Sequence, residues 1–343
     1  MADKKSIKDL GEFGLIDYLT KDIVPIHKST LKGIGDDAAV LDYKNKQVVV
    51  TTDLLLEGIH FDLVYTPLKH LGYKAVVVNL SDVVAMNATP KQITVSIGIS
   101  SRFTLEMVEE LYSGIRLACE TYQVDLVGGD TSASLTGLTI SITCIGEGEK
   151  DELVYRSGAK DTDIICVTGD LGAAYMGLQL LEREKKVLED VKGVQPDFEG
   201  FEYVLEKQLK PEVRLDIIKN LREKEIPVTS MMDISDGLSS ELLHICKQSE
   251  CGCRVYEDRI PIDYQTAKLA EEFNMNLVTA ALNGGEDYEL LFTVPIDYYD
   301  KVVMIEGVKV IGHITKPELG AYLVTRGDQE IPLIAQGWNS MAE

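Results

Sequence analysis

The sequence lacks the features of membrane, secreted and nucleic-acid-binding proteins. No run of about 18 apolar residues is present, so no membrane-spanning helix is predicted, and the N-terminus has no continuous apolar stretch typical of a signal peptide. Positive charge is scarce, since 34 Lys and Arg stand against 56 Asp and Glu, giving a net charge of −22. This balance would repel a nucleic-acid backbone or an anionic membrane surface. We therefore expect a cytoplasmic protein that binds neither nucleic acid nor membrane.

Cysteine patterns and the common phosphate-binding motifs are also missing. The six cysteines lie in dissimilar contexts and form no C-x-x-C pair, which predicts neither a disulfide framework nor a zinc site. The chain contains no G-x-x-x-x-G-K-[ST], no H-E-x-x-H and no G-x-G-x-x-G after an expected strand. Any nucleotide chemistry must therefore use another design.

Length and residue pattern predict two domains that mix helices and strands. The 343 residues, 45% of them hydrophobic, exceed what one core usually organises. In the first half we expect a strand over 47–52 that is buried on both faces, half-buried strands of an antiparallel sheet over 93–99 and 138–144, and helices over 69–86 and 104–121, the second capped by Thr104. A charged, glycine-containing stretch over 146–151 separates an α+β domain, 1–148, from an α/β domain, 149–343. In the second half we expect a strand over 163–168 and a helix over 238–248.

Aspartates stand at the expected ends of these elements. They are Asp36, Asp37, Asp53, Asp82, Asp130, Asp233 and Asp236. Carboxylate oxygens are the ligands that Mg²⁺ prefers. The alternative is ordinary turn or cap chemistry, because Gly and Asp are common turn residues and Ser and Asp cap helices.

Asp82 is the aspartate that turn chemistry explains least. At helical spacing it shares one face of the 69–86 helix with Asn79, Ala75 and Val78, and that helix is apolar nearly all round. An unpaired buried carboxylate costs several kcal/mol, and no Lys or Arg lies one turn away on that face. A metal ligand is favoured over a cap of a neighbouring helix.

Three further segments combine oxygen ligands with glycine or a helix start. Thr51, Thr52 and Asp53 can offer side-chain and backbone oxygens to a divalent ion. The paired glycines before Asp130 follow an expected short strand over 124–127, where they allow backbone to approach a phosphate or form a hairpin turn. Ser235 precedes a helix and can meet a phosphate there or simply cap it. Because a polyphosphate among so many carboxylates would be repelled, several Mg²⁺ ions and phosphoryl transfer by positioning are the simplest interpretation.

Eight segments in this order resemble the thiamine-monophosphate kinases over almost the whole chain. They are Gly11-Glu-Phe-Gly-Leu-Ile16, Gly33-Ile-Gly-Asp-Asp-Ala-Ala-Val40, Thr51-Thr-Asp-Leu-Leu-Leu-Glu-Gly-Ile-His-Phe61, Asn79-Leu-Ser-Asp82, Gly128-Gly-Asp-Thr131, Arg156-Ser-Gly-Ala-Lys160, Asp233-Ile-Ser-Asp-Gly-Leu238 and Gly284-Gly-Glu-Asp-Tyr-Glu-Leu290. The resemblance implies the fold of aminoimidazole ribonucleotide synthetase, with an N-terminal mixed sheet that pairs across a homodimer and a C-terminal α/β domain that closes the cleft. It also implies transfer of the ATP γ-phosphate to thiamine monophosphate with several Mg²⁺ ions and no catalytic side chain.

The same resemblance implies roles for individual residues. Metal ligands would be Asp37, Thr51, Thr52, Asp53, Asp82, Asp130, Asp233 and Asp236. ATP would meet Gly129, Asp130, Arg156 and Ser235, and the thiamine moiety would meet His60, Glu286 and Trp338. Trp338, the single tryptophan, suits stacking on a cationic heterocycle, although it could instead anchor the C-terminal tail by packing.

Two departures from the family pattern concern turns. Asn87 replaces the usual glycine after the Asp82 helix, and Asp161-Thr162 replaces the usual Pro-Gly after Lys160. Both put local loop geometry in doubt, and neither alters an expected ligand.

Three alternative functions are weaker. Selenophosphate synthetase would need a reactive cysteine in an N-terminal Gly-rich loop, and the first cysteine here is Cys119. Aminoimidazole ribonucleotide synthetase should lack the combination of His60 with Gly-Gly-Glu-Asp-Tyr. A non-catalytic Mg²⁺- or nucleotide-binding dimer would gain stability from Mg²⁺ without turning over ATP.

Overall fold

The computed structural model describes residues 15, 18–32, 40–190 and 198–336, and the chain divides into two compact units. Unit 1 comprises Met1–Val83 with Ala88–Glu152, and unit 2 comprises Val84–Asn87 with Leu153–Glu343. Among the described residues, none of the helices combines the length and the hydrophobicity needed to cross a bilayer.

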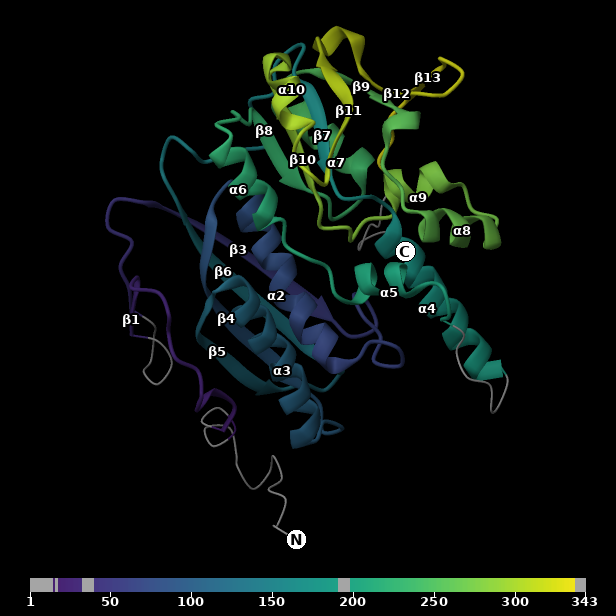
Figure 1. Ribbon diagram of the computed structural model, residues 1–343. Helices are drawn as coiled ribbons and strands as arrows, with labels where there is room; N and C mark the ends of the chain where they lie inside the picture. The colour runs from purple at the N-terminus through teal and green to yellow at the C-terminus, as the bar shows by residue number, and fades with distance from the viewer. Residues whose placement is uncertain (1–14, 16–17, 33–39, 191–197, 337–343) are drawn as a thin grey trace. The chain divides into compact units, whose positions relative to one another are not determined.

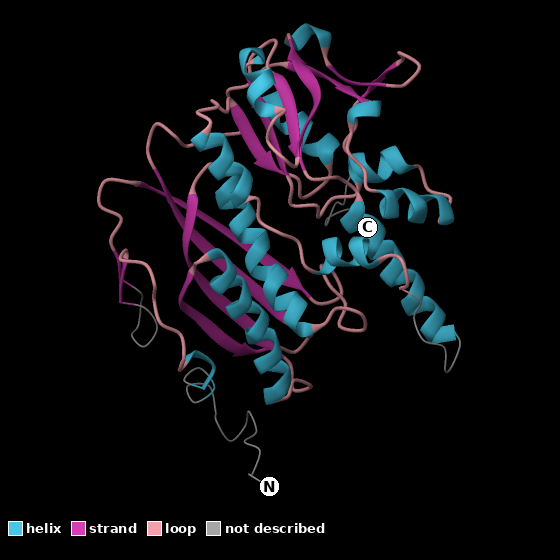
Figure 2. Ribbon diagram, in the orientation of Figure 1, coloured by secondary structure: helices cyan, strands magenta, loops and turns pink. Residues whose placement is uncertain are grey.

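Unit 1 is built on a mixed four-stranded sheet in the order β3-β6-β4-β5 (Figure 1). Its strands are β3 (Gln47–Leu56), β4 (Thr89–Ile99), β5 (Asp125–Ala133) and β6 (Thr139–Gly148). Two short strands, β1 (Thr30–Lys32) and β2 (Val40–Leu41), precede them in the sequence and pair with each other. The helices α2 (Leu68–Ala85) and α3 (Leu105–Tyr122) cover one face of the sheet (Figure 2). Both helices agree with the predicted ranges, and Thr104 caps α3 by accepting a hydrogen bond of 3.3 Å from Met107 N.

Alternation in the central strands forms the core of unit 1. Ile93, Val95 and Ile97 of β4 and Ile140 and Ile142 of β6 are each at most 3% exposed. In a strand, every second side chain points to the same face, so these residues make one apolar layer beneath the helices. The predicted alternation is confirmed for both strands.

The strand β3 differs from its prediction in length and in burial. It does not end at Thr52 but continues to Leu56, because its register with β6 persists to the pair Leu56–Thr139. Burial on both faces is wrong as well: Val48, Val50 and Leu54 are 46%, 61% and 50% exposed. β3 lies at an edge of the sheet, and the helices cover the other face.

The strand β5 also corrects the prediction. Gly128 to Thr131 are neither a hairpin turn nor a segment after a strand, but lie inside β5, which pairs in parallel with β4. The antiparallel pairing expected of β4 and β6 is confirmed, and the parallel pair of β4 and β5 makes the sheet a mixed one, as the family resemblance implies. The helix α3 supplies the crossover that two neighbouring parallel strands need, which makes this pairing possible.

Unit 2 contains a seven-stranded sheet in the order β13-β12-β9-β11-β7-β10-β8. Its strands are β7 (Ile164–Thr168), β8 (Ser230–Asp233), β9 (Gly252–Tyr256), β10 (Leu290–Val294), β11 (Val308–Thr315), β12 (Ala321–Val324) and β13 (Glu330–Pro332). The helices are α4 (Ala173–Asp190), α5 (Glu202–Leu209), α6 (Leu215–Glu223), α7 (Leu238–Gln248), α8 (Tyr264–Glu272), α9 (Leu277–Asn283) and α10 (Tyr299–Val302). β9 and β12 run parallel, and the other neighbouring strands run antiparallel.

Two apolar clusters hold unit 2 together. The larger one joins the sheet to α7 through residues such as Ile165, Leu242 and Leu291. The smaller one packs α4 against α5, α8 and α9. Mixed sheets covered by helices in both units confirm the predicted combination of α and β structure.

The approach of α2 to α3 in unit 1 depends on two glycines. A Cβ atom added to Gly72 would lie 2.1 Å from the carbonyl oxygen of Leu111, and one added to Gly114 would lie 1.8 Å from that of Lys69. Both neighbours are helical backbone, which cannot yield as a side chain can. The two helices therefore touch backbone to backbone at this crossing.

We expect Gly114→Ala to lower the free energy of unfolding by about 1–3 kcal/mol, because the added methyl group must push α3 away from α2. Urea denaturation measures this change. Gly98→Ala is the control, since its Cβ would meet its nearest neighbours at 3.5 Å, an ordinary contact. Equal stability of Gly114→Ala and the wild type would contradict the close helix contact.

Candidate active site

Two carboxylates and a threonine of unit 1 meet between β3 and α2. The hydroxyl of Thr51 donates a hydrogen bond of 2.6 Å to Asp82 Oδ2, and Asp53 lies two residues further along the same face of β3. The structure thus brings three of the predicted metal ligands together.

Asn79 fixes the main chain of this cluster. Its Oδ1 accepts from Asp53 N at 3.0 Å, while its Nδ2 donates to the carbonyl of Ala75 at 3.0 Å. The side chain is 1% exposed. Asn79 therefore ties β3 to α2 one turn before Asp82, a role that its place on the predicted helix face could have indicated.

The environment of Asp53 disfavours its charge. Burial, and secondly the negative charge of Asp82, raise the pKa of the Asp53 carboxyl from 3.8 to about 6. A divalent cation would lower this pKa again, because it stabilises the ionised form of both carboxylates. The pair has the donor chemistry that suits Mg²⁺.

Thr52 projects to the other side of the sheet from Thr51 and Asp53. It donates to the carbonyl of Ile142 at 3.1 Å and accepts from the hydroxyl of Thr143 at 3.1 Å. Its hydroxyl is thus held within the sheet, and the structure does not bring it to the Asp53–Asp82 pair.

Asp130 lies at the opposite edge of the sheet from Asp53. The register runs from Asp53 to Ile142, Val95 and Gly129, one residue before Asp130. Three steps between strands correspond to roughly 14 Å. Asp130 is exposed, and its Oδ1 accepts from Thr131 N at 2.9 Å. Within unit 1 it does not join the Asp53–Asp82 pair, so any metal it holds is a different one.

Gly129 has a structural reason to be glycine. A Cβ at this position would lie 1.9 Å from the carbonyl oxygen of Val95 on β4. Close packing between β5 and β4 accounts for this residue without a phosphate.

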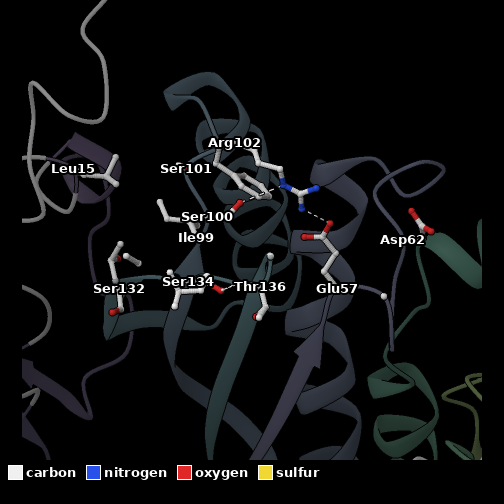
Figure 3. Close-up of a pocket in the computed structure, with 16 residues that line it drawn as sticks. Leu15, Glu57, Asp62, Ile99, Ser100, Ser101, Arg102, Ser132, Ser134 and Thr136 are labelled. Atoms are coloured by element: carbon white, nitrogen blue, oxygen red, sulfur yellow. Dashed lines mark hydrogen bonds and ion pairs between the residues drawn. The ribbon is translucent and has the colours of Figure 1, made fainter.

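A cavity of about 990 Å³ opens where β4 and β5 end in unit 1 (Figure 3). Arg102, from the loop after β4, forms an ion pair with Glu57, from the turn after β3. The other oxygen of Glu57 accepts from Leu138 N at 2.7 Å. Serine and threonine side chains supply most of the remaining polar wall, and Ile99, Phe103 and Leu135 supply apolar surface.

His60 belongs to the turn that forms one wall of this cavity. Its Nδ1 accepts from Leu56 N at 3.0 Å, which places the ring proton on Nε2. The main chain closes the turn, since Gly58 N donates to Phe61 O at 2.8 Å. The turn thus holds the histidine in one orientation.

In unit 2, two of the motifs that lie far apart in sequence pack side by side. Glu286 N donates to Ser235 O at 2.7 Å, and Tyr288 N donates to Ile234 O at 2.9 Å. A Cβ on Gly285 would lie 2.6 Å from Ser235 O. The main chain of Glu286 therefore lies beside the segment that carries Asp233, Ser235 and Asp236.

The carboxylates of the Gly284–Glu289 segment have different tasks. Asp287 is buried and accepts from Gly172 N at 2.9 Å; burial raises its pKa to about 8. Glu289 accepts from Thr168 at 2.5 Å and pairs with Lys207 at 2.9 Å. Glu286 accepts from Gln208 Nε2 at 3.0 Å and has a φ of +59°, an uncommon conformation outside glycine. Asp287 and Glu289 hold the fold, which leaves Glu286 as the candidate for substrate.

Glu241 is a residue that the motif analysis missed. Its Oε1 accepts from Asp236 N at 3.1 Å, and its Oε2 is buried without a hydrogen-bond partner among the described residues. Burial, with the charges of Asp236 and Asp233, raises its pKa to about 8. An acidic residue in the first turn of α7 was the available signal. Three carboxylates thus gather at the start of this helix.

Of the remaining predicted residues, one lies in the described part of the chain and two lie outside it. Arg156 is exposed, in the loop before β7. Asp37 and Trp338 lie outside the described residues. Among the described residues, no three Asp, Glu, His or Cys side chains form a ready-made metal cage.

The two unusual turns keep a glycine-like conformation without glycine. Asn87 has a φ of +53° and Thr162 a φ of +75°. Asn87 is held by Arg222, whose Nε donates to Asn87 Oδ1 at 3.0 Å. Both departures from the family pattern therefore stand at turns where this chain adopts a left-handed backbone.

Comparison with known proteins agrees with these features. Two family models match: AIR synthase related protein, N-terminal domain, over residues 35–147, and AIR synthase related protein, C-terminal domain, over residues 163–323. Thiamine-monophosphate kinase of Aquifex aeolicus is 35% identical over 91% of this chain and 98% of its own. That of Bacillus subtilis is 35% identical over 83% of this chain and 84% of its own.

Solved structures give the same result. AaThiL complexed with AMPPCP and TMP has a TM-score of 0.73 at 32% identity, covering 98% of this chain and 99% of its own. The hydrogenase maturation protein HypE in complex with ATP has a TM-score of 0.74 at 18% identity, covering 93% of this chain and 94% of its own. At that identity the second similarity concerns the fold alone.

We expect Asp53→Asn to stabilise the metal-free protein by about 1–3 kcal/mol at about pH 8. The folded state holds the Asp53 proton up to about pH 6 and the unfolded state only to about 3.8. The free energy of unfolding of the wild type therefore falls as the pH rises from about 4 to above 6. The uncharged amide side chain of the Asp53→Asn variant does not titrate, so the variant avoids this loss. Urea denaturation in EDTA at several pH values measures the effect.

The same variant should lose much of the stabilisation that Mg²⁺ gives the wild type. Asp130→Asn is the control for the metal-free measurement, because this carboxylate is exposed. A lower stability of Asp53→Asn at about pH 8, with a full response to Mg²⁺, would contradict the account of the carboxylate pair.

Proposed function

The chain belongs to the thiamine-monophosphate kinases within the AIR synthase related proteins, and we propose that it transfers the γ-phosphate of ATP to thiamine monophosphate, yielding thiamine diphosphate and ADP. The observation that carries this function is the pairing of Asp53 and Asp82 beside Thr51. Such a pair is suited to binding a metal together with the phosphates of a nucleotide.

The residues act by binding and positioning. Mg²⁺, when bound, would supply neutralisation of the phosphate charge, which phosphoryl transfer requires. In unit 1, Asp53, Asp82, Thr51 and the Thr52 carbonyl would hold it, with Asp130 at a separate place and Asp37 as a further ligand. In unit 2, Asp233 and Asp236 would do so at the start of α7. No side chain needs to form a covalent bond with the phosphoryl group.

ATP would meet both units. Ser235 precedes α7, whose N-terminal amides favour an anion, and Arg156 offers a planar group with five donors. Gly129 and Asp130 on β5 complete the proposed contacts. Unit 1 would then be the metal- and ATP-binding domain, and unit 2 would complete the site.

The thiamine moiety would occupy the cavity that opens where β4 and β5 end. Glu57 lies four positions after Asp53, which corresponds to about 13 Å along an extended strand. A substrate whose phosphate lies at the carboxylate pair can thus extend its rings toward His60 and the cavity. Glu286 and Trp338 are the further proposed contacts of the thiamine moiety.

A cytoplasmic homodimer is part of the proposal. The uncovered face of the unit 1 sheet carries Val48, Val50 and Leu54, all at least 46% exposed. A neighbouring group of exposed apolar side chains is typical of an interaction surface. Pairing of this face with that of a second copy would cover it.

The direct test is thiamine diphosphate formation from thiamine monophosphate, ATP and Mg²⁺ by the purified protein. We expect product from the phosphate ester and none from free thiamine or in EDTA. Stabilisation by Mg²⁺ and ATP without any product would reject the kinase and favour a binding protein.

Asp82→Asn should reduce kcat by at least about a hundredfold, because it removes a ligand charge. The fold should persist, since the Asn oxygen can still accept from Thr51. Steady-state kinetics and circular dichroism check both statements. Asp42→Asn, an exposed aspartate of the same unit, is the control. Wild-type turnover in Asp82→Asn would remove Asp82 from the site.

Val50→Glu should convert the dimer to a monomer, because a charge would be buried at the centre of the proposed interface. Sedimentation velocity measures the mass. Met304→Glu, at a residue that is 75% exposed in unit 2, should leave the dimer intact. A monomeric wild type, or a dimeric Val50→Glu, would reject this face as the interface.

A further inference from the structure

The hydroxyl of Ser249 holds the loop that carries Arg156. Ser249 Oγ accepts hydrogen bonds from Gly158 N at 3.1 Å and from Ala159 N at 3.2 Å, and it donates to Arg156 O at 3.3 Å. One side chain thus contacts the main chain of three residues, 93 to 90 positions away in sequence.

The end of α7 fixes the position of that hydroxyl. Ser249 is the C-cap residue, and its N donates to Ile245 O at 2.9 Å. Glu250 follows with a φ of +50°, and Cys251 N donates to Cys246 O at 3.0 Å. This left-handed residue with a returning amide is the pattern of a Schellman motif. Ser249 therefore extends a rigid helix end.

The loop is also held on the other side of Arg156. Met231 N, in β8, donates to Tyr155 O at 3.0 Å. Gly158 lies so close to Thr229 that an added Cβ would come within 2.4 Å of the Thr229 carbonyl oxygen. The main chain of Arg156 is thus fixed between β8, which ends at Asp233, and the C-terminus of α7.

The side chain of Arg156, in contrast, is not used by the fold. It is exposed, and its guanidinium forms no ion pair or hydrogen bond with the rest of the described chain. A fixed main chain beneath an unused arginine lowers the entropy that binding an anion would otherwise cost.

We propose that Ser249 is a positioning residue for ATP, which acts by fixing the main chain of Arg156 so that the guanidinium meets the nucleotide phosphates. This rests on the proposed function, in which Arg156 binds ATP. Nothing in the geometry requires Ser249 itself to touch substrate. Its effect should therefore fall on ATP and not on thiamine monophosphate.

Ser249→Ala should raise the KM for ATP by about threefold to tenfold, the value of one or two hydrogen bonds. The KM for thiamine monophosphate and kcat should stay at wild-type values. Ser249→Thr, which keeps a hydroxyl, should restore the KM for ATP. Thr325→Ala is the matched control, because Thr325 also holds a loop of unit 2, accepting from Gln329 N at 3.1 Å, and that loop carries no proposed site residue.

The decisive measurement is a double-mutant cycle with Arg156→Ala. If Ser249 acts through Arg156, adding Ser249→Ala to Arg156→Ala should weaken binding of Mg²⁺-AMPPCP no further. Calorimetry with this probe needs no turnover, so it tests the proposal even if the kinase assay fails. Additive losses, an unchanged affinity in Ser249→Ala, or a lower melting temperature with unchanged affinity would each reject the positioning role.

Discussion

The approach of two carboxylates inside unit 1 is the constraint on which the proposed site depends. Asp53 is largely buried, Asp82 adds a like charge, and the pKa of Asp53 rises to about 6. A fold without a cationic ligand would gain stability by replacing one of them. The structure instead maintains the pair with two supports: the Asn79 amide, which ties α2 to β3, and the contact at Gly72 and Gly114, which sets α2 against α3.

In unit 2, some acidic residues are buried and bonded within the fold, and others are exposed. Asp287 and Glu289 are buried with partners inside the fold, whereas Ser235 and Asp236 are exposed beside them. Glu241 secures the main chain of Asp236 from the first turn of α7. The two motifs that pack here, 233–238 and 284–290, are thus one structural element: the buried members hold it in shape, and the exposed members remain available for ligands.

The sequence predicts the helices and the carboxylate pair well because local periodicity encodes them. The apolar 69–86 pattern with one aspartate defines both α2 and the face that meets β3. Edge position and strand direction are different, since they depend on which distant strands pair. That is why β3 was expected to be buried on both faces and the Gly128–Thr131 segment was expected outside a strand. The roles of Glu241 and Ser249 depend on contacts with distant main chain and carry no local signal of comparable strength.

The central claim is that Asp53 and Asp82 hold a divalent metal that the phosphates share. A crystal structure of the full chain with Mn²⁺, AMPPCP and thiamine monophosphate, measured with anomalous diffraction, tests it most directly. The account predicts an anomalous peak within bonding distance of both carboxylates and of a phosphate oxygen. Bound nucleotide with both carboxylates free of metal would contradict it.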